Sequence, residues 1–280
     1  KRRYRLRLFC YVFTTPVLFR YKSIMIDTHC HLQFSDYETD RNLVIQGMID
    51  CGVSRALVVG TDVKSSTSAV NLAEKFPNLH ASVGIHPTEL NQANFDRDLS
   101  ELASLISHPK VVALGEVGLD YKVFGNVEPN RQLQRDCFVR FINLANQAKL
   151  PIIIHTRFAD DDVIEIIKAH KINYGGVIHC FDSDYVMAAS ALDLGLYISF
   201  TGMLTYPKKD SLREVAARLP HDRVLLETDC PYLPPQSKRG ERCEPSDVIE
   251  TAEVLSNLWK RDLAYVDRVT TENAKKLFGI

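Results

Sequence analysis

From Met25 onward the chain alternates short apolar runs with longer amphipathic stretches, and the apolar run recurs eight times. The apolar runs are the predicted strands: 24–27, 55–59, 80–83, 111–114, 152–154, 176–178, 196–199 and 224–226. The amphipathic stretches are the predicted helices: 41–51, 66–76, 96–107, 131–149, 160–170, 185–194, 211–219, 246–260 and 263–278. Strands that alternate with helices form βαβ units around a parallel sheet. Eight such units in about 250 residues predict an α/β fold, a closed (β/α)8 barrel of the TIM type.

We expect this pattern to form one domain over residues 25–280, with residues 1–24 as a separate N-terminal extension. No G-x-G-x-x-G follows the first predicted strand, so the sequence does not support a dinucleotide-binding sheet. The extension has a basic start and an apolar stretch over 8–19, which looks like the beginning of a signal peptide or a short anchor. The stretch is too short to span a membrane and has no small-residue cleavage site. An upstream extension or a mis-assigned start is therefore expected, with a targeting segment and a structural arm as alternatives.

Charge is distributed unevenly between the extension and the rest of the chain. Seven of the 34 Lys and Arg residues lie within 1–24, which contains no Asp or Glu. The remaining 27 basic residues stand against 35 acidic ones, so the rest of the chain has a formal charge of −8. A body this acidic does not attract polyanions by its overall field. Binding of a nucleic acid would require a local basic patch or bound metal.

The seven cysteines are odd in number, widely scattered and form no C-x-x-C pair. This usage is typical of a reduced compartment rather than of a disulfide-bonded secreted protein. We expect a cytoplasmic protein, monomeric and without membrane contact.

The first predicted strand ends in Asp-Thr-His-Cys-His over residues 27–31. Residues two apart on a strand point to the same side, so His29 and His31 converge on one point. Taken alone, this pair can equally be two exposed loop histidines. Four further residues of metal-binding type follow other predicted strands: Glu116, His155, His179 and Asp229. The C-terminal ends of barrel strands form the rim on which active sites are built, so all six are predicted to meet there.

Four histidines and two carboxylates are too many for one closed tetrahedral site, but they suit two divalent cations that share a bridging carboxylate. We expect Glu116 to be the bridge. His29, His31 and Asp229 would complete one site, and His155 and His179 the other. Mixed nitrogen and oxygen ligands favour Zn, Mn or Fe over Mg, and the choice among Mg, Mn and Zn stays open.

Seven short motifs occur in order along the chain: MIDTHCHL, GIHP, GEVGLDY, IHTR, HCF, YISFTG and ETDCPYL. With these motifs, residues 25–280 resemble the TatD family of metal-dependent deoxyribonucleases within the wider amidohydrolase-like barrels. The resemblance implies a two-metal nuclease that acts on DNA, often as a 3′-5′ exonuclease on single strands.

The sequence departs from the family pattern in three places. Phe158 stands where the family usually has an acid, and Asp182-Ser183-Asp184 replaces a Ser/Gly-rich turn. The run Arg-Gly-x-x-Asn-Glu-Pro reads RGERCEP over residues 239–245. None of these changes removes a predicted ligand, so they bear on substrate preference rather than on hydrolysis.

Phosphodiester cleavage needs a nucleophile, charge neutralisation and help for the leaving oxygen. Glu116 and Asp229 are the predicted catalytic carboxylates; Asp229 would orient the water and accept its proton, or be a plain ligand. His86, beyond the third strand, would contact phosphate or protonate the leaving group, or be a loop histidine without a role. Arg157 is a candidate phosphate contact, because a guanidinium forks onto phosphate oxygens, or a salt-bridge partner of Asp160 or Asp161.

Loops after the seventh and eighth strands contain a cluster of five basic residues: Lys208, Lys209, Lys238, Arg239 and Arg242. This cluster is the predicted basic patch, with Arg239 as a substrate contact, and a solvated charged loop is the alternative. Tyr121, Tyr206 and Tyr232 lie in rim loops and could stack on bases, with Tyr121 as the predicted substrate contact. Tyrosines that merely cover the barrel mouth are equally ordinary.

Three other functions stay open. Related barrels that hydrolyse cyclic amides, phosphotriesters or lactones commonly bridge their metals with a carboxylated lysine after the fourth strand, where this chain has Glu116. An esterase that removes D-amino acids from transfer RNA is a second possibility within the resemblance, so RNA or aminoacyl-tRNA would replace DNA as the substrate. A barrel that only binds or scaffolds is the third, although no predicted ligand is missing.

Overall fold

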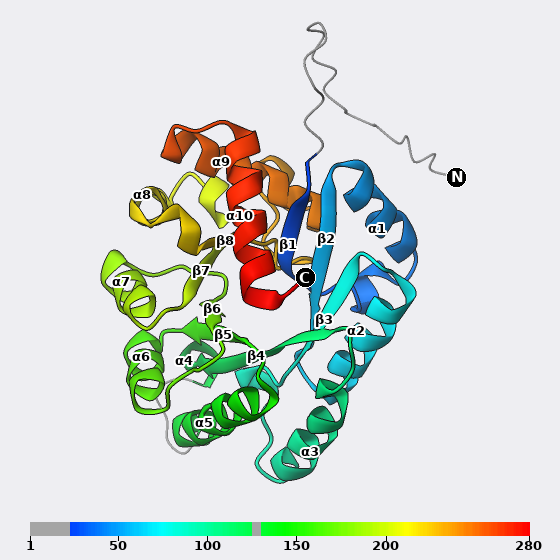
Figure 1. The fold of residues 1–280 in the computed structure, drawn as a ribbon, viewed down its shortest axis with the longest axis vertical. Helices are drawn as coiled ribbons and strands as arrows, with labels where there is room; N and C mark the ends of the chain where they lie inside the picture. Colours follow the sequence, from blue (N-terminus) through cyan, green and yellow to red (C-terminus); the bar gives the residue numbers. More distant parts are fainter. Residues whose placement is uncertain (1–22, 125–129) are drawn as a thin grey trace, which may run out of the picture.

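A computed structural model describes residues 23–124 and 130–280 and places eight parallel strands in sequential order around a barrel (Figure 1). The strands are β1 (Met25–Cys30), β2 (Val53–Val59), β3 (Leu79–Val83), β4 (Val111–Asp120), β5 (Ile152–Arg157), β6 (Gly176–Ile178), β7 (Tyr197–Phe200) and β8 (Val224–Leu226). The chain beyond β8 joins β1, because His31 N donates to Cys230 O and Asp229 N donates to His29 O, both at 2.8 Å. The predicted (β/α)8 barrel is confirmed.

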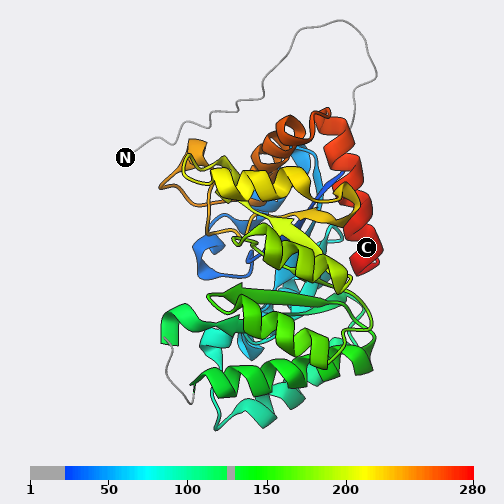
Figure 2. The same ribbon diagram turned by 90° about the vertical axis from the view of Figure 1, so that its left-hand side faces the viewer.

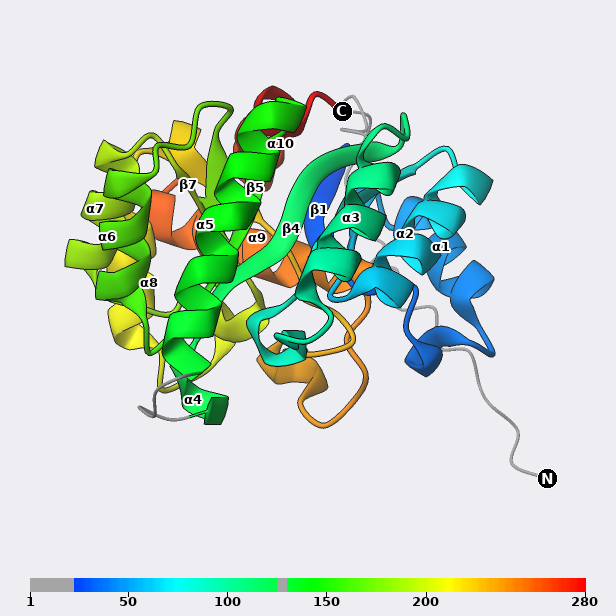
Figure 3. The ribbon, with the colours of Figure 1, turned by 90° about the horizontal axis from the view of Figure 1, so that it is seen from below.

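Helices surround the strands, as Figures 1 and 3 show. They are α1 (Arg41–Asp50), α2 (Val63–Lys75), α3 (Phe95–Ile106), α4 (Tyr121–Phe124), α5 (Asn130–Ala148), α6 (Asp160–Ala169), α7 (Tyr185–Asp193), α8 (Asp210–Arg218), α9 (Val248–Trp259) and α10 (Leu263–Phe278). Short 3-10 turns lie between them: η1 (Ser35–Tyr37), η2 (Pro87–Glu89), η3 (Gly202–Thr205), η4 (His221–Arg223), η5 (Gln236–Lys238) and η6 (Pro245–Asp247).

The second helix begins earlier than the predicted residue 66. Asp62 caps its N-terminus, because the Asp62 carboxylate accepts a hydrogen bond from Ser65 N. Ser66 is instead buried, and its hydroxyl contacts both backbone polar atoms of Gly84 on the next strand connection. The serine therefore joins helix to barrel rather than starting the helix.

Successive side chains along a strand point to opposite faces, so the apolar residues form two layers. Ile153 packs inside the barrel, whereas Ile152 and Ile154 pack between the barrel and the helices. The inner layer is closed at the N-terminal end of the strands by α10, which contributes Leu277 and Phe278. Figure 2 shows α10 (red) at one end of the barrel and the segment before α9 (light orange) at the other. The opposite, C-terminal end is thus left for the polar site.

Strand β4 runs six residues beyond its predicted end at residue 114. The apolar pattern is interrupted there by Gly115, Glu116 and Gly118. Gly118 has a φ of +142°, and a Cβ at this position would lie 2.1 Å from the carbonyl oxygen of His155. The glycine therefore allows β4 and β5 to approach closely beside the rim.

The predicted extension over 1–24 lies, apart from its last two residues, outside the described residues. Within the described part of the chain, no helix combines the length and apolar character that a membrane crossing needs.

Candidate metal centre

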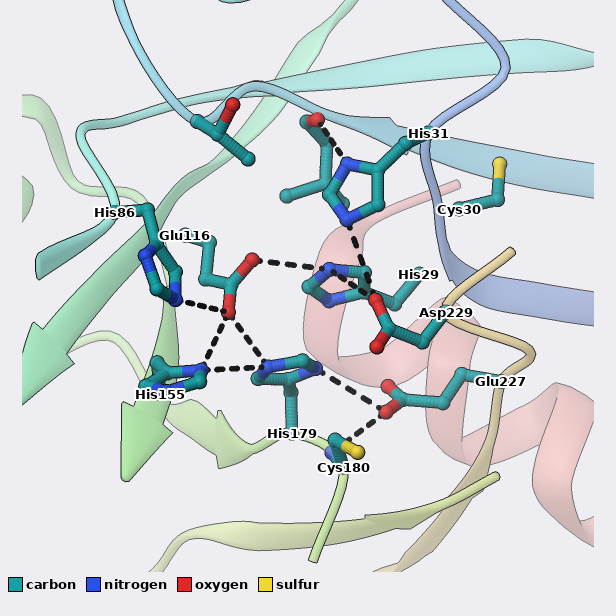
Figure 4. A network of polar contacts seen from close by, with 12 residues as sticks. His29, Cys30, His31, His86, Glu116, His155, His179, Cys180, Glu227 and Asp229 are labelled. Atoms are coloured by element: carbon teal, nitrogen blue, oxygen red, sulfur yellow. Dashed lines mark hydrogen bonds and ion pairs between the residues drawn. The ribbon is translucent and has the colours of Figure 1, made fainter. Parts of the chain in front are cut away.

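All six predicted ligands meet at the C-terminal rim of the barrel, as Figure 4 shows. They are His29 and His31 from the end of β1, Glu116 from β4, His155 from β5, His179 after β6 and Asp229 after β8. Strand alternation puts them there. Ile153 and Val177 face the barrel interior, so His155 and His179, each two residues further on, point to the same side.

The Glu116 carboxylate lies at the centre of the group. Its Oε1 is 2.7 Å from His155 Nδ1 and 2.7 Å from His179 Nε2. Its Oε2 is 3.4 Å from His29 Nε2. The two oxygens of one carboxylate therefore face two different sets of imidazoles.

Asp229 completes the β1 side of the centre. Its Oδ1 lies 3.3 Å from His31 Nε2 and 3.6 Å from His29 Nε2. Asp229 has a φ of +60°, and Cys180, next to His179, has a φ of +48°. Non-glycine residues adopt this left-handed conformation rarely, and it is concentrated at functional sites. In this chain Cys180 and Asp229, both in this conformation, lie just beyond the ends of β6 and β8, at the centre.

Three of the histidines have an oxygen close to their outer ring nitrogen. His31 Nδ1 lies 2.9 Å from Val59 O, which fixes the ring and leaves Nε2 facing Asp229. His179 Nδ1 lies 3.3 Å from Glu227 Oε1, and His155 Nε2 lies 3.3 Å from Asp120 Oδ2. Outer acceptors of this kind orient histidine ligands and raise their basicity.

Glu227 and Asp120 were not predicted from the sequence. Glu227 is buried, and its Oε1 also accepts a hydrogen bond from Cys180 N at 2.6 Å. It stands midway between inward-facing Leu225 and Asp229, so the period-two pattern of β8 could have indicated it. Asp120 lies in the part of β4 that the prediction left out.

His29 provides the test of whether a cation fits. Both of its ring nitrogens are buried and, within the described residues, have no hydrogen-bond partner. A buried polar group without a partner costs free energy unless something unseen satisfies it. One potential ligand atom from each of His29, Glu116 and His179 lies within 4.8 Å of the others, and the same holds for His29, His31 and Asp229. Nitrogen and carboxylate donors at this spacing fit divalent cations.

Charges in the centre are strongly coupled. Burial alone would raise the pKa of Glu116, but the neighbouring His179 and His86 rings and the hydrogen bonds from His155 and His179 hold it well below its usual value. Burial would lower the pKa of His179, but Glu116 and Glu227 raise it well above its usual value. A cation would take the place of the proton between these two groups, because metal binding requires a neutral imidazole.

His86 lies beside the ligands and lines the same pocket. Its Nδ1 accepts a hydrogen bond from Thr88 N at 3.1 Å and lies 2.6 Å from Thr88 Oγ1. Its Nε2 points toward Glu116 Oε1 at 3.6 Å. Burial lowers the pKa of His86 to about 4, so the ring is neutral at pH 7.

The pocket over the centre has a volume of about 480 Å³ and includes Arg157 in its lining. Arg157 is exposed, and its guanidinium makes no hydrogen bond or ion pair with the described residues, so the alternative of a salt bridge to Asp160 or Asp161 is not formed. Tyr232 also lines the pocket. The pocket lining contains no lysine, which leaves no candidate for a carboxylated bridge among the described residues.

Two predicted substrate contacts lie elsewhere. Tyr121 is buried, its hydroxyl bonds to Asp162, and the Arg131 guanidinium lies 4.1 Å from the centre of its ring. Arg239 lies over the ring of Tyr206, 4.6 Å from its centre. Neither Tyr121 nor Arg239 lines the pocket. Base stacking requires a ring with an exposed face, and the buried ring of Tyr121 does not provide one.

The predicted basic patch is largely neutralised by carboxylates. Three of its five members form ion pairs: Lys209 with Asp182, Lys238 with Asp247, and Arg242 with Asp40 and Glu244. The sequence showed the basic residues together but not the acids that fold against them.

The departures from the family pattern have structural roles here. Asp182 pairs with Lys209, Ser183 donates to Asp160, and Asp184 caps α7 by accepting from Met187 N. These contacts hold the loop after β6 against its neighbours and leave the ligands in place.

Comparison with known proteins agrees with this site. A family model described as TatD related DNase matches residues 26–279. The Bacillus subtilis protein YabD, named an uncharacterized metal-dependent hydrolase, is 38% identical over 92% of this chain and 100% of its own length. The crystal structure of the Escherichia coli TatD homolog YjjV superimposes with a TM-score of 0.85 and 30% identity, covering 91% of this chain and 98% of YjjV. The chain is a member of the TatD family of metal-dependent hydrolases.

Proposed function

We propose that this chain hydrolyses phosphodiester bonds of DNA with two divalent cations, as a 3′-5′ exonuclease on single strands. The observation that carries the proposal is the Glu116 carboxylate, whose two oxygens face separate sets of imidazoles below a pocket with an exposed guanidinium, that of Arg157, at its edge. The name of the matching family model supports DNA as the substrate.

The contacts support a division of the ligands between two cations. Glu116 would bridge the two cations. His29, His31 and Asp229 would complete the site on the β1 side, and His155 and His179 the site on the β5 and β6 side. The mixed donors suit Zn or Mn better than Mg, and all three belong in the first test. When bound, the cations would supply a water of lowered pKa and neutralise charge on the phosphoryl oxygens.

The remaining residues act on the substrate directly. Asp229 is held by His31 and would orient the attacking water and accept its proton, in addition to its role as a ligand. His86 would donate from Nε2 to a phosphoryl or leaving oxygen, because its Nδ1 is already occupied by the Thr88 amide. Arg157 would fork onto a phosphate. Arg239 and Tyr121 are not included, since neither lines the pocket.

Hydrolysis of an aminoacyl ester is a second candidate. Glu89, Asp120 and Asp182 line the pocket with carboxylates that would attract the ammonium group of such an ester. Five cysteines of the described residues are free thiols, in keeping with the predicted reducing, cytoplasmic compartment: Cys30, Cys137, Cys180, Cys230 and Cys243. A monomeric state stays a prediction.

The test is metal-stripped protein, resupplied separately with Mg, Mn and Zn, and incubated with single-stranded DNA labelled at either end. Glu116→Ala and Asp229→Ala variants run beside it. Glu89→Ala is the matched control, because it removes a carboxylate from the same pocket without touching the predicted ligands.

A ladder that shortens from the 3′ end, needs added metal and disappears in the two ligand variants would support the proposal. Cleavage that survives Glu116→Ala would overturn the assigned site. No cleavage with any metal, while metal analysis still finds bound ions, would remove DNA as the substrate and turn attention to aminoacyl esters.

A further inference from the structure

A second groove, of about 710 Å³, lies beside the metal-centre pocket. No described residue lines both, but consecutive residues line one and then the other. Arg157 lines the pocket and Phe158 lines the groove, and in the same way Asp182 lines the pocket and Ser183 the groove. A polymer that enters the pocket at Arg157 therefore has the groove as the adjoining space.

Phe158 is placed unusually for an aromatic residue. It directly follows β5 and has a φ of +54°, a conformation that bulky side chains rarely adopt and that is concentrated at functional sites. Its side chain is 75% exposed, so the ring does not contribute to the core. Val186, on α7 in the same groove lining, is 72% exposed. The turn after β5 thus places Arg157 in the lining of the pocket and the exposed ring of Phe158 in the lining of the groove.

The charge of the groove restricts what can occupy it. Five acidic residues line it, against two basic ones: Asp160, Asp161, Asp162, Glu165 and Asp184, against Arg131 and Lys168. Asp160 accepts from Thr156 and Ser183, and Asp162 pairs with Arg135, so these two are held in place by the fold. Such a lining repels phosphate groups. It accepts an uncharged planar group, and its carboxylates can receive hydrogen bonds from the exocyclic amino groups of bases.

We infer that Phe158 is a stacking platform for a nucleobase of the substrate strand, next to the phosphate that Arg157 contacts. Every base has a π-face, and an exposed aromatic ring beside a phosphate-binding group is the usual arrangement in single-strand binding. Phe158 then determines specificity for a base-bearing strand without taking part in the hydrolytic step. This inference rests on the proposed nuclease function.

The test compares two oligodeoxynucleotides that differ only in their two 3′-terminal nucleotides, which carry bases in one and are abasic tetrahydrofuran units in the other. We expect Phe158→Ala to lower kcat/KM for the base-bearing strand by roughly 10- to 100-fold, mainly through KM, since one stacked base contributes about that much. Cleavage of the abasic strand should not change. Phe158→Trp should restore the preference. Leu43→Ala, which removes an equally exposed apolar side chain from α1, should alter neither rate.

A parallel binding experiment separates this inference from the proposed function. An oligodeoxynucleotide with 2-aminopurine at its 3′ end should lose fluorescence on binding to the wild type and retain it with Phe158→Ala. If the wild type quenches but does not cleave, the base site stands and the nuclease proposal fails. Equal losses on both strands in Phe158→Ala, or no change on either, would overturn the base site. Absence of both cleavage and quenching would overturn both.

Discussion

Buried polar groups lie at both ends of the barrel, where the first and last strands meet. The two ends differ in whether these groups are hydrogen-bonded. At the N-terminal end, Asp267 of α10 accepts from Ile24 N at 3.0 Å. Asn273 donates to the carbonyls of His221 and Val224, each at 2.8 Å. At the C-terminal end, neither ring nitrogen of His29 has a hydrogen-bond partner among the described residues.

This difference in hydrogen bonding distinguishes a cluster that stabilises the fold from a cluster that serves function. A buried polar group that is fully hydrogen-bonded contributes modestly to stability, whereas one left unmatched lowers it. The N-terminal cluster is therefore built to hold β1 and β8 together. The C-terminal cluster holds its donors ready for cations at a cost in stability, which is where barrel enzymes place their chemistry.

The largest expected effect comes from the C-terminal end. Glu116→Gln keeps the shape of the side chain but removes the charge between the two imidazole sets. We expect kcat/KM for single-stranded DNA to fall by roughly 1000-fold, as for loss of a central electrostatic contact. The free energy of unfolding of metal-free protein should fall as well, because the facing imidazoles hold Glu116 in its charged form in the folded state and the amide loses that contact. Kinetics and urea unfolding measure the two effects, and an unchanged kcat/KM would contradict the central role of the carboxylate.

Asn273→Ala tests the opposite end. Removing its amide takes the donor from the buried carbonyl of Val224 and the part-buried carbonyl of His221, so the free energy of unfolding should fall by about 2 kcal/mol. The kcat/KM of the folded protein should stay within about twofold of wild type, since the residue lies at the far end of the strands. Asn257→Ala, an exposed asparagine on α9, is the matched control for urea unfolding. Loss of activity without loss of stability would break the comparison.

Glu227→Gln tests whether the acceptor behind His179 tunes the centre. The amide keeps the size and an oxygen for Cys180 N, but loses the charge that faces His179 Nδ1. Mutation of such an outer partner typically lowers metal affinity or activity about 10- to 100-fold. Metal titration should show the weaker binding, and high metal concentration should restore most of the activity. Failure of excess metal to restore activity would indicate a purely structural role.

Much of this could be predicted from sequence, for identifiable reasons. The meeting of the six predicted ligands could be predicted because each lies in the C-terminal half of a strand or just beyond its end, and the C-terminal ends of parallel strands meet at one rim. Glu227 was missed because it precedes a more obvious ligand, although it lies on the same inward row. The basic patch was overestimated, since Arg242 meets Asp40 only after residues about 200 positions apart fold together. Contacts of this kind depend on loop geometry that no local pattern encodes.

The smallest expected effect concerns an exception at the N-terminal end. His80, near the start of β3, has a buried Nδ1 without a hydrogen-bond partner in the described chain. Burial, with Lys110 and Arg55 nearby, lowers its pKa from 6.5 to about 4. Below pH 6.5 the unfolded chain binds a proton that the folded chain rejects until about pH 4. Stability should therefore fall as the pH falls through this window, by up to about 1 kcal/mol per pH unit.

His80→Gln removes the titrating ring and should reduce this slope. Urea unfolding of both proteins at pH 7, 6 and 5 measures the difference, and other groups that titrate in the same window cancel between them. Parallel curves would show that the His80 ring is protonated in the folded chain, with solvent or a neighbour satisfying its nitrogen. The N-terminal end would then have no unmatched group at this position. A smaller slope in His80→Gln would instead show that this end of the barrel also tolerates an unmatched nitrogen, where no chemistry requires it.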